Sequence, residues 1–176
     1  MYPIFRFAKE MAIFRRAPKM DLGDVHISSH VCWPWDVDPW MELNNGRALT
    51  LYDLSRLPMA YRSGLITLVK EKGWQMAVAG ASVRYRRRVR MFQRFTTHST
   101  ILGWDDRFFY FQQSMWSRGE ATSSLLARMA VTDSNGILAP AEAAVALGWC
   151  TASPELPEYV SAWINAEAKR PWPPKV

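Results

Sequence analysis

Apolar side chains recur at helical spacing at the start of the chain, over residues 4–14. One face of that segment would carry Ile4, Phe7, Ala8, Met11 and Phe14. Arg6, Lys9 and Arg16 lie toward the other face. This pattern predicts a short, basic amphipathic helix, and the stretch "RRAPKMDLGD" after it is typical of a linker.

The pattern then changes to a β-rich stretch and two helical ones. Residues 25–35 predict a first strand. In residues 46–57 apolar side chains return at helical intervals, so we expect a helix there. Pro58 is acceptable as the first residue of a helix, because the N–H that proline lacks would have no intrahelical partner at that position. We therefore expect a second helix over residues 58–72, ended by Gly73.

Strand-like stretches separated by turn residues follow from residue 74 to residue 132. The four strands would cover residues 75–89, 94–104, 107–116 and 121–132. Two further helices are expected at 140–148 and 154–169. A long helix that arrives before such a run of strands can be wrapped by the sheet, which buries its apolar face. We therefore predict an α+β domain in which a helix is layered on an antiparallel sheet.

A chain of 176 residues with moderate charge fits one globular domain with flanking segments. We divide it into a basic amphipathic extension at 1–20, a main domain at 21–150 and a helical tail at 151–176. No run of about 18 apolar residues is present, so no segment is expected to span a membrane. Charged residues interrupt the start of the chain, so a secretory signal is not expected. The two cysteines lack metal-ligand spacing, which favours reduced thiols in a cytoplasmic protein.

The net charge of +6 favours an anionic partner. It does not choose among nucleic acid, lipid headgroups and a phosphorylated ligand. The predicted N-terminal helix has two interpretations of its own. It can pack on the domain or on a partner subunit, or it can contact a membrane surface peripherally. We favour packing.

The densest chemistry lies in "WPWDVDPWMELNNGR", residues 33–47. Asp36 and Asp38 stand one residue apart, and Asn44 and Asn45 come just before the predicted helix. An asparagine at a helix start can cap it through its side chain. The first backbone N–H groups of a helix have no intrahelical partner, and with the helix dipole they attract negative charge.

The run "DVDPWMELNN", followed by a helix with Asp53 and Arg56, resembles the hotdog-fold acyl-CoA thioesterases. The resemblance is to the hydroxybenzoyl-CoA thioesterase-like branch and the thioesterase-like superfamily. The stretches "VRYRRRV", "ILGWDDRFFYFQQSM" and "DSNGILAPAE" resemble later strands and the closing turn of the same group. The match covers roughly residues 24–148. It implies a hotdog fold, an antiparallel β-sheet wrapped around a long central helix.

The resemblance also implies an activity and an assembly. Such a protein hydrolyses an acyl-CoA thioester to a carboxylic acid and free coenzyme A, with no metal or organic cofactor. It is a homodimer or tetramer with each active site at the subunit boundary. Glu42 stands where the family run has a histidine, a change that can alter or abolish activity. The competing hypothesis is a non-catalytic hotdog protein that binds acyl groups or a membrane surface.

The resemblance assigns Asp38 as the catalytic carboxylate, which attacks the thioester or activates water. The alternative for Asp38, and for Asp36, is a carboxylate that bonds backbone N–H groups of its own turn. Both would point to the same side if the stretch were extended. The backbone N–H of Asn45 is the predicted donor to the thioester oxygen, and Asn44 is expected to contact substrate, to cap the helix, or both.

Two further groups have competing interpretations. Asp53 can line the acyl pocket or orient water as a catalytic residue, or it can form an ion pair with Arg56, which is the slightly favoured alternative. Strand alternation would place four arginines of "SVRYRRRVRM" on one face: Arg84, Arg86, Arg88 and Arg90. Arg86 and Arg88 are predicted to bind the phosphates of coenzyme A. A solvated strand edge is an equal alternative, and nucleic acid is a weaker one.

Overall fold

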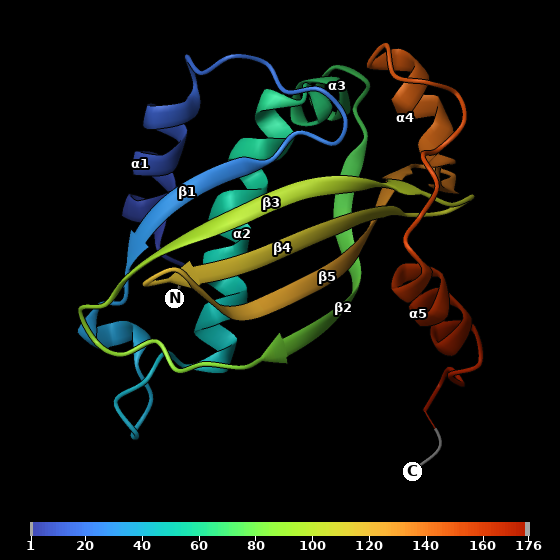
Figure 1. Ribbon diagram of the computed structural model, residues 1–176. Coiled ribbons are helices and arrows are strands. Elements are labelled where there is room, and N and C mark those ends of the chain that lie inside the picture. Colours follow the sequence, from blue (N-terminus) through green and yellow to red (C-terminus); the bar gives the residue numbers. More distant parts are fainter. Residues whose placement is uncertain (1, 175–176) are drawn as a thin grey trace.

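A curved antiparallel sheet wraps around one long helix, α2, as Figure 1 shows. The computed structural model describes residues 2–174. Along the sheet the strands follow the order β1-β3-β4-β5-β2, and the two-residue strand β6 pairs with β5. The bounds are β1 His26–Val31, β2 Gln75–Tyr85, β3 Arg94–Trp104, β4 Phe109–Ser117, β5 Glu120–Asp133 and β6 Gly136–Ile137. The predicted α+β architecture, with a sheet around a central helix, is confirmed.

The central helix α2 (Asn45–Arg62) passes through Pro58 without a break. The prediction of two helices that meet at Pro58 was wrong. A proline inside a helix removes one backbone hydrogen bond, and here Pro58 is buried together with Met59 and Ala60. The helix ends instead at Arg62, shortly before Gly64, whose φ of +84° is the left-handed conformation that glycine adopts freely. The short helix α3 (Leu65–Glu71) follows.

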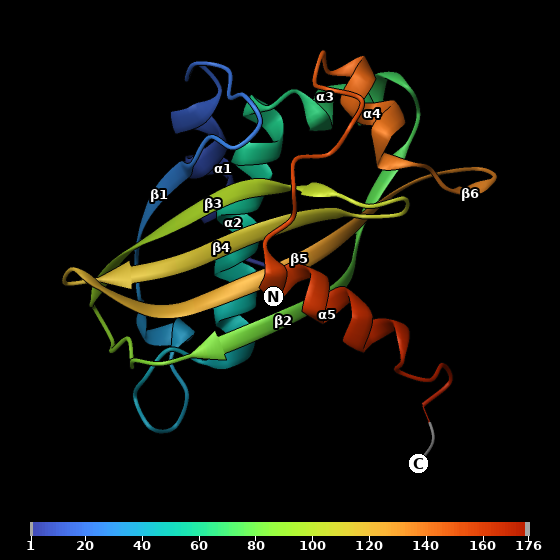
Figure 2. The ribbon, with the colours of Figure 1, turned by 45° about the vertical axis from the view of Figure 1, so that its right-hand side comes forward.

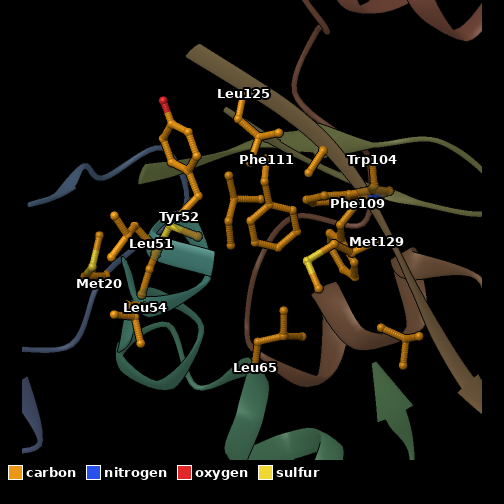
Figure 3. Packing of buried hydrophobic residues seen from close by; sticks show 14 of the residues in the cluster. Met20, Leu51, Tyr52, Leu54, Leu65, Trp104, Phe109, Phe111, Leu125 and Met129 are labelled. Carbon is orange, nitrogen blue, oxygen red and sulfur yellow. The ribbon is translucent and has the colours of Figure 1, made fainter. Parts of the chain in front are cut away.

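The main core fills the space between α2 and the concave face of the sheet. Leu51 and Leu54 of the helix belong to the same buried cluster as Phe109 and Phe111 of β4 (Figure 3). Residues 109, 111, 113 and 115 of β4 alternate toward this core, as the two-residue period of a strand requires. Burial of this apolar surface is the main force that holds the sheet around the helix.

A second, smaller apolar cluster lies on the other face of the sheet. There the C-terminal helix α5 (Glu158–Ala168) packs Val160 and Trp163 against Tyr110 of β4. An ion pair of 3.2 Å between Arg128 and Glu167 joins β5 to the same helix. Figure 2 shows α5 lying across the sheet, well away from the short helix α4 (Pro140–Ala146).

The N-terminal helix α1 (Ile4–Phe14) packs on the domain beside β1. The ring of Phe14 meets His26 edge to face at 4.4 Å, and Glu10 is buried. Arg6 donates to the carbonyl of Val31 at 2.8 Å, and Lys9 donates to a further carbonyl of β1 at 3.2 Å. The helix therefore covers the outer edge of β1, because an edge strand otherwise leaves such carbonyls unpaired.

Two predicted strands end earlier than expected. The first stops at Val31, and residues 34–36 form a turn of 3₁₀ helix. The strand predicted over 75–89 stops at Tyr85, because the N–H groups of Arg86 and Arg87 both donate to the carbonyl of Thr122. This doubled contact ends the regular ladder. No helix within residues 2–174 is long and apolar enough to cross a membrane.

Candidate functional site

The loop before α2, residues 37–43, folds back on itself. Val37 and Leu43 form an isolated β-bridge, and the N–H of Asp38 donates to the carbonyl of Glu42 at 2.8 Å. Met41 takes a left-handed backbone conformation with φ of 61°, which lets the chain reverse inside this loop. The turn therefore fixes the backbone position from which the Asp38 side chain extends.

Asp38 is half-buried, and its carboxylate oxygens have different surroundings. Its Oδ1 accepts the N–H of Trp40 at 2.9 Å and that of Glu42 at 3.4 Å. No hydrogen bond to Oδ2 is found within residues 2–174. The turn-forming interpretation therefore applies to Oδ1, and Asp38 also lines a cavity.

The start of α2 supplies the second element. The side chain of Asn44 accepts the N–H of Arg47 at 3.0 Å and so caps the helix. The side chain of Asn45 accepts the N–H of Gly46 at 2.9 Å. The N–H of Asn45 itself precedes the first intrahelical bond, so it remains available as a donor. Tyr85, at the end of β2, donates to the carbonyl of Asn45 at 3.1 Å and holds the helix start in place.

The arginine segment, residues 86–90, forms the other side of the candidate site. Because β2 ends at Tyr85, the predicted alternation of arginines on one strand face was wrong beyond Arg84. The segment instead runs beside the loop, where Glu42 pairs with Arg90 in a β-bridge. Oε2 of Glu42 and Nε of Arg88 form an ion pair at 3.0 Å. Glu42 therefore fixes an arginine at the position where the family run has a histidine.

These segments enclose a cavity of about 590 Å³, within the range of small-ligand sites. Five predicted site residues line it together: Asp38, Asn44, Asn45, Arg86 and Arg88. Met115 and Ser123 also line it, and the Ser123 hydroxyl is 2.8 Å from that of Tyr52. Tyr85 and Ser123 were not predicted as site residues, because a strand tyrosine or serine carries no local signal of what it faces.

The third predicted catalytic residue, Asp53, is not among the residues that line the cavity. It forms the alternative ion pair with Arg56, which also donates to the buried Gln113 at 2.7 Å. Burial raises the pKa of Asp53, and the nearby guanidinium opposes that shift. On a helix of 3.6 residues per turn, Asp53 lies about 80° around from Asn45. A role for Asp53 in the reaction stays a prediction.

Asp36 does not share the environment of Asp38. It is only 1% exposed and accepts the N–H of Trp33 at 3.0 Å, as a turn carboxylate does. Arg6 and Arg47 also pair with it, at 2.6 and 3.1 Å. The two aspartates were expected to point to one side only if the stretch were extended, and that condition is not met, because Asp36 ends a 3₁₀ turn.

Nothing in the described part of the chain groups three or more histidine, cysteine or acidic residues as a metal site would require. Cys32 is buried and Cys150 is exposed, and both are free thiols, as the sequence predicted. Burial raises the pKa of the Cys32 thiol to about 11, so it is protonated at neutral pH. The chemistry available at the cavity is that of a carboxylate, a backbone donor and arginines.

A family model of the thioesterase-like superfamily matches residues 32–164, which is most of the chain. The chain belongs to this superfamily. The match begins just before the loop with Asp38 and includes the whole sheet after β1, so the cavity lies inside it.

Two animal relatives and several solved structures are similar. The protein THEM6 of Xenopus laevis is 31% identical over 148 residues, 82% of this chain and 70% of that protein. THEM6 of Drosophila melanogaster is 25% identical over 157 residues, 88% of this chain and 78% of that protein. The names of these two relatives state no activity.

The solved structures agree on the fold. A probable thioesterase, YbaW of Escherichia coli, gives a TM-score of 0.62 at 16% identity, over 65% of this chain and 89% of that one. A DHNA-CoA thioesterase of Staphylococcus aureus gives 0.60 at 11% identity, over 82% and 91%. SAV2348 of the same organism, solved in complex with CoA, gives 0.58 at 11%, over 90% and 91%. The hotdog fold is thereby confirmed.

Proposed function

We propose that this protein hydrolyses an acyl-CoA thioester at the cavity between the 37–43 loop, the start of α2 and the arginine segment. One observation carries the proposal. Asp38, Asn45 at the N-terminus of α2, Arg86 and Arg88 all line the same cavity of about 590 Å³. Membership of the thioesterase-like superfamily supports this reaction class.

Asp38 acts on the attacking group and Asn45 acts on the thioester oxygen. The carboxylate accepts a proton from water, or attacks the carbonyl carbon itself and is released by water later. The N–H of Asn45 and the positive end of the helix dipole stabilise the negative charge that develops on the oxygen. The C–S bond then breaks, so coenzyme A leaves as the thiol and the acyl group leaves as a carboxylic acid.

Arg86 and Arg88 bind the phosphates of coenzyme A in this proposal. Arginine suits phosphate because its guanidinium donates two parallel hydrogen bonds. Glu42 holds Arg88 by the 3.0 Å ion pair, so the residue that replaces the family histidine positions a substrate-binding group. SAV2348, a structural relative solved in complex with CoA, supports a CoA ligand on this fold.

We infer a homodimer that forms along β2. This strand lies at one end of the sheet, and most of its residues are exposed. A long, exposed strand edge pairs readily with a second copy, and antiparallel pairing of identical edges gives a closed two-fold dimer. Tyr85 and Arg86 at the end of this strand line the cavity, so a second copy would lie beside the site. Analytical ultracentrifugation tests this, since a monomer at micromolar concentration would exclude it.

A second candidate function, contact with a membrane surface, rests on the outward face of α1. The packed helix buries Phe7 and Phe14 only in part, and it leaves Phe5 93% exposed, together with Ile4 and Ile13. Basic residues of the same segment are also exposed: Lys9, Arg15 and Arg16. An apolar and basic face of this kind suits an anionic bilayer.

Vesicle co-sedimentation tests this second candidate. Vesicles of phosphatidylserine and phosphatidylcholine should retain the intact chain at low salt and release most of it at high salt, because added ions screen the attraction. A Phe5→Ser and Ile13→Ser variant keeps the docked face of α1 and should bind less. If the intact chain ignores these vesicles, the protein makes no membrane contact through α1.

The experiment for the main proposal is a panel of acyl-CoA substrates with detection of the free thiol. The panel spans short and long aliphatic chains and aromatic acyl groups, and it includes the Asp38→Asn variant. Turnover of at least one substrate by the wild-type chain, lost in the variant, supports the proposal. Binding of acyl-CoA without release of thiol would instead identify a non-catalytic acyl-binding protein.

A further inference from the structure

A second and larger cavity, of about 780 Å³, lies beside β1 and β3, whereas the proposed active site adjoins the end of β2. It is formed where β1 and β3 meet the turn between β4 and β5, and it shares no lining residue with the first cavity. Neither the family match nor the proposed reaction gives it a role.

Two arginines define the charge of this cavity. Thr96 of β3 lies opposite Trp116 of β4; Arg94 is the first residue of β3, and Arg118 lies in the turn that follows β4. Both arginines line the cavity, and neither side chain has a carboxylate partner anywhere in residues 2–174. Like charges that line one cavity repel each other, so an anion bound between them relieves that repulsion.

The other charges around the cavity are already compensated. Arg6 pairs with Asp36, and Lys9 pairs with Glu10 at 2.6 Å. Burial, and then the positive charge of Lys9, lowers the pKa of His30 to about 3, so its ring adds no charge near neutral pH. No carboxylate lines the cavity, and the positive potential there comes mainly from Arg94 and Arg118.

The remaining walls are aromatic or carry hydroxyl groups. Trp33 and Phe95 line the cavity, and Trp116 stacks on His98 at 5.8 Å between ring centres. Such walls bind an apolar body, while the two guanidinium groups bind an anionic head. His30, which also lines the cavity, leaves its buried Nε2 without a hydrogen-bond partner in the described residues.

We propose that this cavity is a second binding site, for an amphipathic anion whose carboxylate or phosphate head contacts Arg94 and Arg118. The site does not depend on the proposed thioesterase reaction. Its ligand differs from an acyl-CoA in having one small head group next to its apolar tail. A cavity of this volume accommodates such a molecule without rearrangement of the sheet.

Calorimetric titration with three eight-carbon probes tests the proposal on the full chain. Octanoate, octyl phosphate and octanol share a tail and differ in the head group. We expect either anion to bind at least about tenfold more tightly than octanol, since charged hydrogen bonds to arginine are worth that factor or more. The tighter of the two anions identifies the head group as carboxylate or phosphate.

Two double variants locate the site. Arg94→Gln with Arg118→Gln should abolish the preference for the anions and leave thioester hydrolysis unchanged. Arg86→Gln with Arg88→Gln removes the same net charge at the first cavity and should keep the preference. Equal binding of octanol, or loss of the preference only in the second variant, would overturn the proposal. Circular dichroism confirms that both variants fold, which is expected because all four side chains are exposed.

Discussion

Nη1 of Arg6 lies 2.6 Å from Oδ2 of Asp36, although 30 residues separate them in the chain. The other oxygen of the same carboxylate lies 3.1 Å from Nε of Arg47, near the start of α2. One buried carboxylate therefore joins the N-terminal helix, the loop before the site and the central helix. Asp38, two residues later in the same loop, lines the cavity.

Replacement of Asp36 by Asn should destabilise the protein strongly. Asn keeps the shape but removes the buried negative charge that Arg6 and Arg47 both contact, and breaking a buried ion pair typically costs about 3–5 kcal/mol. Urea unfolding measures the loss. Asp106→Asn, at an exposed turn, is the matched control and should change stability by less than about 0.5 kcal/mol. Equal effects in the two variants would show that the buried contacts contribute nothing.

Replacement of Asp38 by Asn should lower kcat by about 10²–10⁴ while the fold is kept. Asn preserves the acceptor for the N–H groups of Trp40 and Glu42 but has no negative charge. Thiol release and thermal unfolding measure the two properties. Asp53→Asn is the comparison, because Asp53 is paired with Arg56 outside the cavity. A similar loss of kcat in both variants would restore Asp53 to the reaction and weaken the case for Asp38.

Replacement of Arg86 and Arg88 by Ala should raise KM for acyl-CoA by at least about tenfold and change kcat little. Phosphate contacts far from the thioester act equally on bound substrate and transition state, so they affect binding and not the chemical step. Steady-state kinetics separate the two. Arg84→Ala on β2 removes an arginine that does not line the cavity, and it should leave KM unchanged. A lower kcat at constant KM would argue against phosphate binding.

Acid should destabilise the protein through His26. Burial first, and then the charge of Arg62, lowers the pKa of His26 to about 4. Arg62 lies 3.0 Å from Nδ1 and can only donate, so that nitrogen is unprotonated and Nε2–H donates to Ser28. Below pH about 6.5 the unfolded chain binds a proton that the folded chain refuses, so stability falls as the pH drops from 6.5 toward 4.

Unfolding midpoints between pH 7.5 and 4.5 test this prediction. A His26→Gln variant keeps a hydrogen-bonding side chain without the titration, so its midpoint should fall less over that range. The variant can be less stable overall, and the comparison therefore uses the slope and not the absolute midpoint. Parallel slopes for the two proteins would assign the acid effect to other groups.

Local patterns determined most of the elements of this fold. The alternation of residues 94–104 and 121–132 and the helical spacing of residues 4–14 each recur in the structure almost at the predicted bounds. Periodicity succeeds there because each segment buries one face against the same core. The error at Pro58 has the opposite cause. The helix α2 continues through Pro58 because this residue is buried in the core, a factor that a local rule about proline does not include.

The sequence by itself also determined which residues form the candidate site, through the spacing of Asp38, Asn44 and Asn45 within ten residues of one another. A loop and a helix start that are adjacent in the chain stay adjacent in space. Tertiary structure alone decided the roles of the two aspartates. Asp36 is a buried anchor because Arg6 of the distant helix α1 pairs with it, and no sequence pattern near Asp36 predicts that contact. It likewise separated Asp53 from the cavity, since the rotation of a helix against a sheet is fixed by packing.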